Sequence, residues 1–336
     1  MNKTAVILSN TGTPDDTSVK AVRRYLKEFL GDKRVISIPW LMRKILVNGI
    51  IAPFRAPKSA RLYKKVWTLE GSPLILFSES LKAKLQNSLG DNYHVLLGMR
   101  YGNPSLLNAM EEVKKKGYRK IIVLPLYPQY ASSTTGSILD LVYGEIKSWN
   151  TIPSVSTLGQ FYDDPGFLNC FADNIIKLNP AEYDHILFSY HGLPLSHLRA
   201  AHKGKDCSHF NCTREINHHN ALCYHATCYA TTRLLAEKIN CKPDKYTVCF
   251  QSRFSKNWLS PFADEEVVNK AAQGKKKLLI VSPAFVTDCL ETIIELGDEY
   301  KELFFENGGE QFNWVQSLND KDNWVDVLTG LITGEM

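Results

Sequence analysis

The sequence predicts an α/β fold of two Rossmann-like domains, each a mostly parallel sheet flanked by helices. Short apolar runs alternate with helix-length amphipathic stretches along the chain, which is the pattern of parallel strands joined by crossover helices. The apolar runs contain few polar residues, as expected for strands that are buried on both faces. The length of 336 residues suits two domains better than one.

Each expected strand is an apolar run that ends in a polar loop, and each expected helix is an amphipathic stretch between two such runs. The strands are expected at residues 5–9, 93–98, 120–125, 154–157, 185–189, 246–251 and 277–282. The helices are expected at residues 18–30, 78–89, 105–116, 166–177, 230–239 and 289–305. A further helix, at residues 322–331, follows the second set of strands and could pack back on the first.

The two sets of strands divide the chain into two domains of similar construction. The N-terminal domain is expected to contain residues 1–150 and 318–336, and the C-terminal domain residues 151–317. Ligands of such sheets bind outside the carboxyl ends of the strands. The residues that directly follow the strands are therefore the candidates for a functional site.

Charge, apolar runs and cysteine content limit the classes of function. Forty basic and 35 acidic residues give a net charge of +5, which is too mild to indicate nucleic-acid binding. The first apolar run, residues 5–8, is broken at once by polar residues, and no run of about 18 apolar residues follows. We therefore expect a cytoplasmic protein, whose eight cysteines indicate metal ligation or buried thiols rather than disulfides.

Residues 39–54 form an apolar stretch with two adjacent cations, Arg43 and Lys44, and without the pattern of a buried strand. An exposed apolar lip that includes Leu41 and Ile45 and is bordered by basic residues would suit a flat apolar substrate. It would also suit peripheral contact with the inner face of the plasma membrane. An ordinary buried helix explains the stretch equally well.

His191 lies in the segment Ser-Tyr-His-Gly-Leu-Pro, just after the strand expected at residues 185–189. Gly192 allows the backbone to turn, and Pro194 fixes the path of the chain beyond it. A neutral imidazole held there could accept a proton or bind a metal near neutral pH. A single histidine in such a position is more often structural, so the motif alone leaves both roles open.

Three glutamates, Glu291, Glu295 and Glu299, recur at four-residue intervals after the strand expected at residues 277–282. On an α-helix this spacing places them on one stripe, where like charges repel unless cations or protons lie between them. Carboxylate oxygens suit hard or borderline divalent ions, so the row could bind such an ion or pass it inward. A solvated acidic face is the alternative, although the apolar neighbours of the row weaken it.

Aromatic, hydroxyl and guanidinium side chains follow three further strands. Together they offer stacking surfaces and carboxylate partners to an extended flat dianion. The residues are Arg100, Tyr101, Tyr127, Ser132, Ser252 and Arg253. Each of them alone indicates little.

Four cysteines lie in an insertion at residues 203–228, with the spacing C-x4-C-x10-C-x4-C. They are Cys207, Cys212, Cys223 and Cys228. Four thiols in a histidine-rich loop that begins near His202 indicate a metal site. Four-residue gaps suit an iron–sulfur cluster at least as well as zinc. Zinc and unrelated free thiols remain alternatives.

Several segments, taken together, resemble the ferrochelatase family. Residues 189–194 are similar to its histidine motif, and residues 288–295 resemble its second active-site segment. Residues 8–14 are similar to its N-terminal opening, although Ser9 and Thr11 depart from the commoner residues. Residues 67–74, 100–102, 124–130 and 251–253 also resemble family segments, in the same order along the chain. The resemblance covers nearly the whole chain.

The resemblance implies insertion of Fe²⁺ into protoporphyrin IX, the last step of haem synthesis, in a porphyrin cleft between or beside the two domains. His191 would face the pyrrole nitrogens, Glu291 would be its acidic counterpart, and Glu295 would extend the acidic row. These three residues would be the iron ligands, and the lip and the six residues named above would contact the porphyrin.

The resemblance also bears on cofactors and on alternative functions. Some ferrochelatases carry a 2Fe–2S cluster, which favours that cofactor for the four cysteines, although Cys228 also resembles a cysteine of relatives without a cluster. No nucleotide cofactor is implied, and the oligomeric state is open. Coproporphyrin III as the substrate, a cobalt chelatase of corrinoid synthesis, and a non-catalytic haem or iron–sulfur sensor remain alternatives. Intact His191 and Glu291 disfavour the sensor.

Overall fold

The computed structural model describes residues 3–334, which form two compact units. Unit 1 contains the chain up to Tyr127, residues 131–160 and the chain from Asn319 onward, and unit 2 contains residues 128–130 and 161–318. The outermost residues of the expected N-terminal domain, 1–2 and 335–336, lie outside the described residues. Each unit is built around one four-stranded parallel sheet, so the predicted fold class is confirmed.

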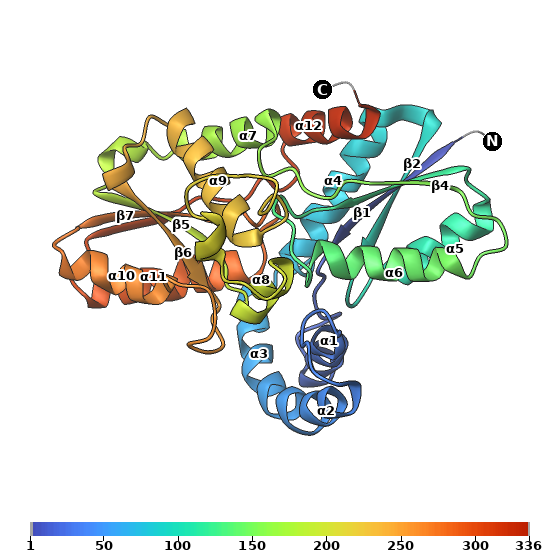
Figure 1. The fold of residues 1–336 in the computed structure, drawn as a ribbon, viewed down its shortest axis with the longest axis horizontal. Coiled ribbons are helices and arrows are strands. Elements are labelled where there is room, and N and C mark those ends of the chain that lie inside the picture. Colours follow the sequence, from blue (N-terminus) through green and yellow to red (C-terminus); the bar gives the residue numbers. More distant parts are fainter. Residues whose placement is uncertain (1–2, 335–336) are drawn as a thin grey trace. The chain divides into compact units, whose positions relative to one another are not determined.

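Unit 1 alternates strands and helices along the chain (Figure 1). Its sheet has the order β2-β1-β3-β4, and the strands are β1 (Thr4–Asn10), β2 (Tyr93–Met99), β3 (Lys120–Pro125) and β4 (Ser154–Thr157). Its α-helices are α1 (Val19–Gly31), α2 (Trp40–Ile45), α3 (Ala52–Val66), α4 (Pro73–Leu89), α5 (Leu106–Lys116), α6 (Thr135–Lys147) and α12 (Asp322–Thr333). A π-helical segment, η1 (Leu46–Ile51), joins α2 to α3, and a 3-10 turn, η2 (Gly90–Asn92), precedes β2.

Unit 2 repeats the construction of unit 1. Its sheet has the order β6-β5-β7-β8, and the strands are β5 (His185–His191), β6 (Tyr246–Gln251), β7 (Lys277–Val281) and β8 (Gln311–Trp314). Its α-helices are α7 (Pro165–Ile176), α8 (Leu195–Ala201), α9 (Tyr224–Lys238), α10 (Ala263–Ala272) and α11 (Tyr300–Glu306). A π-helical segment, η6 (Glu291–Glu299), leads into α11, and the 3-10 turns are η3 (Pro180–Glu182), η4 (Cys207–Phe210) and η5 (Pro243–Lys245).

The first strand of each unit is central in its sheet. β1 pairs with β2 and β3, and β5 pairs with β6 and β7. The apolar residues of β1 and of β5 are buried, because helices cover both faces of each sheet. This burial explains why the strands read as unbroken apolar runs in the sequence. It also places the carboxyl ends of three neighbouring strands together at one edge of each sheet.

Several elements of the fold were not expected from the sequence, including α3, α6, α8, α10 and β8. The strand β8 is an edge strand of four residues in which only Phe312 is buried, so its apolar pattern is too short to recognise. The helix α6 begins at a turn of small and hydroxyl residues, which read as a loop. Thr135, Gly136 and Ser137 are nevertheless buried in its first turn, so this end of the helix lacks a polar face.

Within residues 3–334, no helix combines the length and the apolar character that crossing a bilayer requires.

Candidate active site and metal centre

His191 is the last residue of β5, so its side chain lies at the carboxyl end of the central strand of unit 2. Its Nδ1 lies 2.7 Å from the carbonyl oxygen of Gly192. Because a carbonyl oxygen only accepts hydrogen bonds, Nδ1 carries the proton and Nε2 keeps its lone pair. The rings of Trp258 and Phe285 flank the imidazole, each with its centroid 6.4 Å away. The imidazole is thus held in the tautomer that can accept a proton or bind a metal through Nε2.

Gly192 is needed because the neighbouring strand comes very close to it. Its N–H donates to the carbonyl oxygen of Gln251 at 2.8 Å. A Cβ atom at this position would lie 2.8 Å from the same oxygen and 3.2 Å from the Trp258 ring. Its φ angle is not in the left-handed region. The close approach, rather than a sharp turn, therefore explains the glycine.

Glu295 is the carboxylate that the protein holds most firmly near His191. Its Oε1 accepts hydrogen bonds from the Ser252 N–H at 2.7 Å and from the Tyr300 hydroxyl at 2.9 Å, and its Oε2 accepts one from the Ser252 hydroxyl. Burial raises the pKa of Glu295, and these donors and the nearby charge of His191 only partly offset the effect. A carboxyl group with a raised pKa is suited to exchanging protons near neutral pH.

Hydroxyl and amide groups tie the strand ends around Glu295 together. The Ser189 hydroxyl donates to the Gln251 side-chain oxygen at 2.8 Å, and the Ser282 hydroxyl donates to the Ser189 carbonyl oxygen at 2.7 Å. These bonds join the ends of β5, β6 and β7. Ser252, the next residue of β6, has a φ of 58°, a left-handed conformation that is uncommon for serine. This conformation directs both its N–H and its hydroxyl at Glu295.

The prediction that the three glutamates lie on one stripe of an α-helix is wrong, because they lie on a different type of helix. The segment from Glu291 to Glu299 is a π-helix, in which the Tyr300 N–H donates to the Glu295 carbonyl oxygen five residues earlier. Four residues therefore make less than one turn, and the three glutamates have different surroundings. Glu291 is half-buried and accepts a hydrogen bond from the Cys289 thiol at 3.0 Å, whereas Glu299 is exposed.

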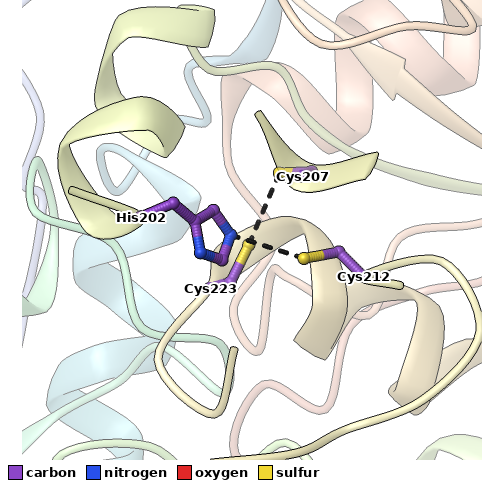
Figure 2. Close-up of side chains that lie close together, drawn as sticks. All are labelled: His202, Cys207, Cys212 and Cys223. Atoms are coloured by element: carbon purple, nitrogen blue, oxygen red, sulfur yellow. Dashed lines mark hydrogen bonds between the residues drawn. The ribbon is translucent and has the colours of Figure 1, made fainter. Parts of the chain in front are cut away.

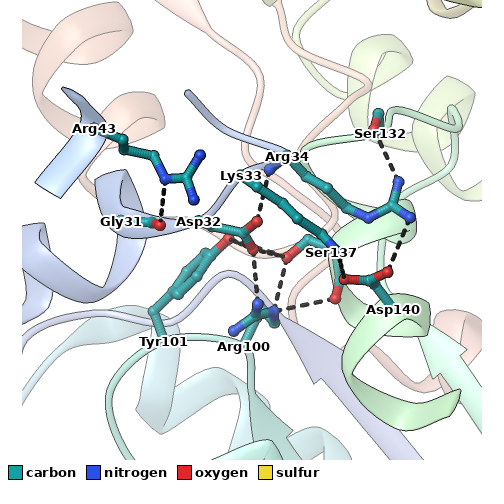
Figure 3. Close-up of polar contacts among 10 residues, drawn as sticks. All are labelled: Gly31, Asp32, Lys33, Arg34, Arg43, Arg100, Tyr101, Ser132, Ser137 and Asp140. Carbon is teal, nitrogen blue, oxygen red and sulfur yellow. Dashed lines mark hydrogen bonds and ion pairs between the residues drawn. The ribbon is translucent and has the colours of Figure 1, made fainter. Parts of the chain in front are cut away.

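Arg100 and Tyr101, two of the expected porphyrin contacts, belong to a polar network in unit 1 (Figure 3). The Arg100 guanidinium pairs with Asp32 at 2.7 Å and donates to the Ser137 hydroxyl at 2.7 Å. The hydroxyl of Tyr101 donates to Asp32 at 2.9 Å. Burial alone would raise the pKa of Asp32, but hydrogen bonds from Ser137 and the Arg34 N–H, and the charge of Arg100, lower it overall. Sequence reasoning missed Asp32, which no motif singled out.

The other expected porphyrin contacts differ in how far their polar groups are engaged. Ser132 accepts a hydrogen bond from Arg34 at 3.2 Å, and the hydroxyl of Tyr127 bonds with that of Thr11. Arg253 of unit 2 pairs with Asp264 at 2.7 Å and Glu265 at 2.6 Å. The guanidinium of Arg253 is therefore already neutralised by two carboxylates of this chain.

The lip of unit 1 is helical and exposed. Leu41 and Ile45 in α2 are 59% and 61% exposed, and Trp40, Met42, Ile50 and Phe54 are also exposed. Arg43 is different, because it is buried and its guanidinium donates to the carbonyl oxygens of Gly31 at 2.9 Å and Ile38 at 2.7 Å. Of the two expected adjacent cations, only Lys44 remains at the surface, where its amine lies 4.9 Å from the Trp40 ring centroid.

Three of the four expected cysteine ligands come together with a histidine (Figure 2). The ligand atoms of His202, Cys207, Cys212 and Cys223 all lie within 4.8 Å of one another. Cys228 lies outside this group, fully buried in α9. A cysteine group is therefore present as expected, with His202 in the place that was expected for Cys228. The histidine-rich composition of the loop was the available signal for it.

The fold of the chain is shared with solved chelatase structures. It resembles the sirohydrochlorin chelatase SirB from Bacillus subtilis subspecies spizizenii in complex with cobalt, with a TM-score of 0.53 and 10% identity over 96% of this chain and 91% of that one. SirB from Bacillus subtilis with Fe³⁺ gives a TM-score of 0.51 and 12% identity over 98% of this chain and 94% of that one.

Sequence comparison defines the family more narrowly. The ferrochelatase family model matches residues 3–336. The chain is 41% identical to a ferrochelatase of Coxiella burnetii (strain Dugway 5J108-111) over 97% of this chain and 92% of that protein. It is 40% identical to a ferrochelatase of Legionella pneumophila (strain Paris) over 98% of this chain and 99% of that protein. The chain belongs to the ferrochelatase family, which confirms the predicted family.

Proposed function

We propose that the protein inserts Fe²⁺ into protoporphyrin IX, with release of two protons, and that His191 and Glu295 perform the proton transfers. The observation that carries this proposal is an imidazole at the carboxyl end of β5 together with the carboxyl group of Glu295, which η6 holds against Ser252 just after the end of β6. The reaction needs such groups, since a free-base porphyrin loses both N–H protons when a divalent ion enters. Membership of the ferrochelatase family identifies the metal as Fe²⁺ and the second substrate as a porphyrin.

Nε2 of His191 is the group that first accepts a pyrrole proton in this proposal. In the neutral imidazole, the bond from Nδ1 to Gly192 leaves the lone pair of Nε2 as the acceptor. Glu295, whose charge interacts with His191, then stabilises the imidazolium and takes up a proton in its turn. Glu291 is proposed as the carboxylate that binds the incoming iron, because it is only half-buried and can reach solvent. The thiol of Cys289 orients this carboxylate.

The remaining expected residues are proposed to bind the porphyrin. In unit 1, Leu41 and Ile45 offer the macrocycle an apolar surface, and Tyr127 and Ser132 offer hydroxyl groups. In unit 2, Ser252 offers a hydroxyl group. The guanidinium groups of Arg100 and Arg253 are already paired with carboxylates of this chain. We therefore assign them to positioning these neighbours rather than to binding the carboxylates of the porphyrin. The apolar character of the lip favours protoporphyrin IX over the more highly charged coproporphyrin III.

The exposed apolar residues of the lip also support a peripheral membrane contact. Trp40 and Lys44 combine an aromatic ring with a cation, a combination that suits the headgroup region of a bilayer. Such a contact would place the enzyme at the inner face of the plasma membrane. Sedimentation with anionic vesicles tests this membrane contact. A double variant with Leu41→Ser and Ile45→Ser should no longer bind the vesicles.

Anaerobic incubation with Fe²⁺ and porphyrin, followed by absorbance, tests the activity. Wild type should convert protoporphyrin IX faster than coproporphyrin III, and His191→Ala should lose at least about 100-fold in rate, as removal of a general base usually does. Turnover by a folded His191→Ala variant above about a tenth of wild type would refute the role of His191. The 2Fe–2S cluster expected from the sequence takes no part in this proposal, because metal insertion itself does not need it.

A further inference from the structure

The group of three cysteines and one histidine before α9 has the geometry of a site for a single ion. We infer that one tetrahedrally coordinated ion of the zinc class is bound by His202, Cys207, Cys212 and Cys223. This ion fixes the position of Tyr224, which supports His191. The metal assignment does not depend on the proposed chemistry at His191, whereas the connection to His191 rests on the proposed function. The site differs from the cluster expected from the sequence both in the number of metal ions and in its fourth ligand.

Two of the distances between the ligand atoms match those of one tetrahedral ion, and all of them are within 4.8 Å. With zinc–sulfur bonds of about 2.3 Å and zinc–nitrogen bonds of about 2.0 Å, tetrahedral angles give sulfur–sulfur separations of about 3.8 Å and sulfur–nitrogen separations of about 3.5 Å. The Cys207 and Cys223 sulfurs are 3.8 Å apart, and the Cys212 sulfur is 3.4 Å from Nε2 of His202 (Figure 2). A binuclear cluster divides its ligands between two irons and would hold the two pairs farther apart.

The position of Cys228 explains why it does not complete the site. Cys223 is the N-cap of α9, and Cys228 lies five residues later. At 3.6 residues per turn, five residues rotate the side chain by about 140°, so the two thiols point to different sides of the helix. Cys228 is fully buried, with Tyr224 and Tyr190 as its neighbours. It is a core thiol, and His202 completes the tetrahedron from the chain that precedes the loop.

The loop buries little apolar surface, because most residues from 203 to 219 are exposed. It is held by aromatic contacts of Phe210 with His202 and His219, and by polar contacts such as the Asn220 amide donating to the carbonyl oxygens of Phe210 and Glu215, both at 2.9 Å. A metal bound by four residues of such a loop supplies folding free energy directly. His202, Cys212 and Cys223 are buried, as the ligands of a closed structural site are.

The site is connected to the catalytic histidine through one hydrogen bond. Tyr224 directly follows the ligand Cys223, and its hydroxyl donates to the carbonyl oxygen of His191 at 3.0 Å. Fixing Cys223 therefore fixes the start of α9 and the donor that supports the end of β5. Tyr224 is a positioning residue in this arrangement. Removing the metal should lower turnover without removing any group that touches the substrates.

Elemental analysis of the full-length protein tests the metal assignment. The protein is purified without oxygen from iron-replete cells, incubated with iron and sulfide, and desalted with a chelator that removes loosely bound iron. We expect about one zinc ion per chain, no acid-labile sulfide and no visible absorption. Cys212→Ser should lose the zinc, and Cys228→Ala, the matched control, should keep it. Iron and sulfide in the amounts of a binuclear cluster, with colour that depends on Cys228, would overturn the inference.

Measurements on the wild type keep the inference testable if the Cys212 variant does not fold. A mercurial that blocks thiols should release about one zinc ion to a coloured zinc indicator, and cobalt incorporated in place of zinc should show the visible bands of a tetrahedral thiolate site. A wild-type chain that releases no zinc and binds no cobalt contradicts the site. Tyr224→Phe should keep the zinc and lower kcat about threefold to tenfold with little change in KM. Unchanged kcat would contradict the connection to His191.

Discussion

Replacing Glu295 by glutamine separates its chemical role from its structural role. Glutamine has the shape of glutamate, so its oxygen can still accept the bonds from the Ser252 N–H and Tyr300. Its amide group can donate to the Ser252 hydroxyl. The one contact that becomes unfavourable is the long one from the Gln251 amide, at 3.5 Å. The loss of hydrogen bonding should therefore cost no more than about 1 kcal/mol of stability.

The removed charge acts in the opposite direction on stability. Because burial raises the pKa of Glu295, the stability that this group contributes is present below the ordinary glutamate pKa and is lost as the pH rises through the raised value. Glutamine has no such loss. The Tm of Glu295→Gln relative to wild type should therefore increase as the pH rises above the ordinary glutamate pKa.

The rate should fall far more than the stability changes. A group that exchanges protons in the transition state usually contributes about 100-fold to 10,000-fold, so we expect at least a 100-fold loss of porphyrin metallation by Glu295→Gln. The assay is absorbance of the metalloporphyrin under anaerobic conditions, beside thermal unfolding of the same preparation. Glu299→Gln is the matched control, because Glu299 lies on the same π-helix and is exposed. A folded Glu295→Gln enzyme that keeps a tenth of the activity, or an equal loss in the control, would refute the assignment.

Two further predictions concern the stability of each unit. Asp32→Asn should lower the free energy of unfolding by about 2–3 kcal/mol at pH 7 because it leaves the Arg100 guanidinium without its carboxylate partner. In urea titrations this difference should shrink as the pH falls through the lowered pKa of Asp32, and an unchanged midpoint at pH 7 would contradict the role of the pair. Burial, with a smaller contribution from Lys270, lowers the pKa of His185 to about 4. Between about pH 6.5 and pH 4 only the unfolded chain binds a proton at this histidine, so the wild-type protein should lose stability as the pH falls through this range. His185→Gln should flatten this dependence, measured as Tm against pH, and an equally steep profile would count against the buried neutral imidazole.

The sequence was sufficient to predict the central strands, because their burial determines their residue types. Helices cover both faces of β1 and β5, so both strands read as unbroken apolar runs. The rule that ligands bind at the carboxyl ends of strands then located His191 and Ser252 without any knowledge of the packing. The sequence could not decide whether the lip is exposed, because an exposed apolar helix and a buried one have the same residue pattern. The structure decides it, with Leu41 and Ile45 more than half exposed.

The features that the sequence could not predict depend on contacts between distant segments. Periodicity alone assigned the glutamates to an α-helix, yet the π-helix takes its shape from packing. A Cβ atom on Gly297 of this segment would lie 2.8 Å from Nε1 of Trp314 in β8, so the segment rests directly on a strand that the sequence did not reveal. We infer that this contact fixes the position of η6, from which Glu295 accepts the hydrogen bonds of Ser252. If this reasoning is correct, Gly297→Ala should displace η6 and reduce metallation together with stability, whereas Glu295→Gln should reduce metallation alone.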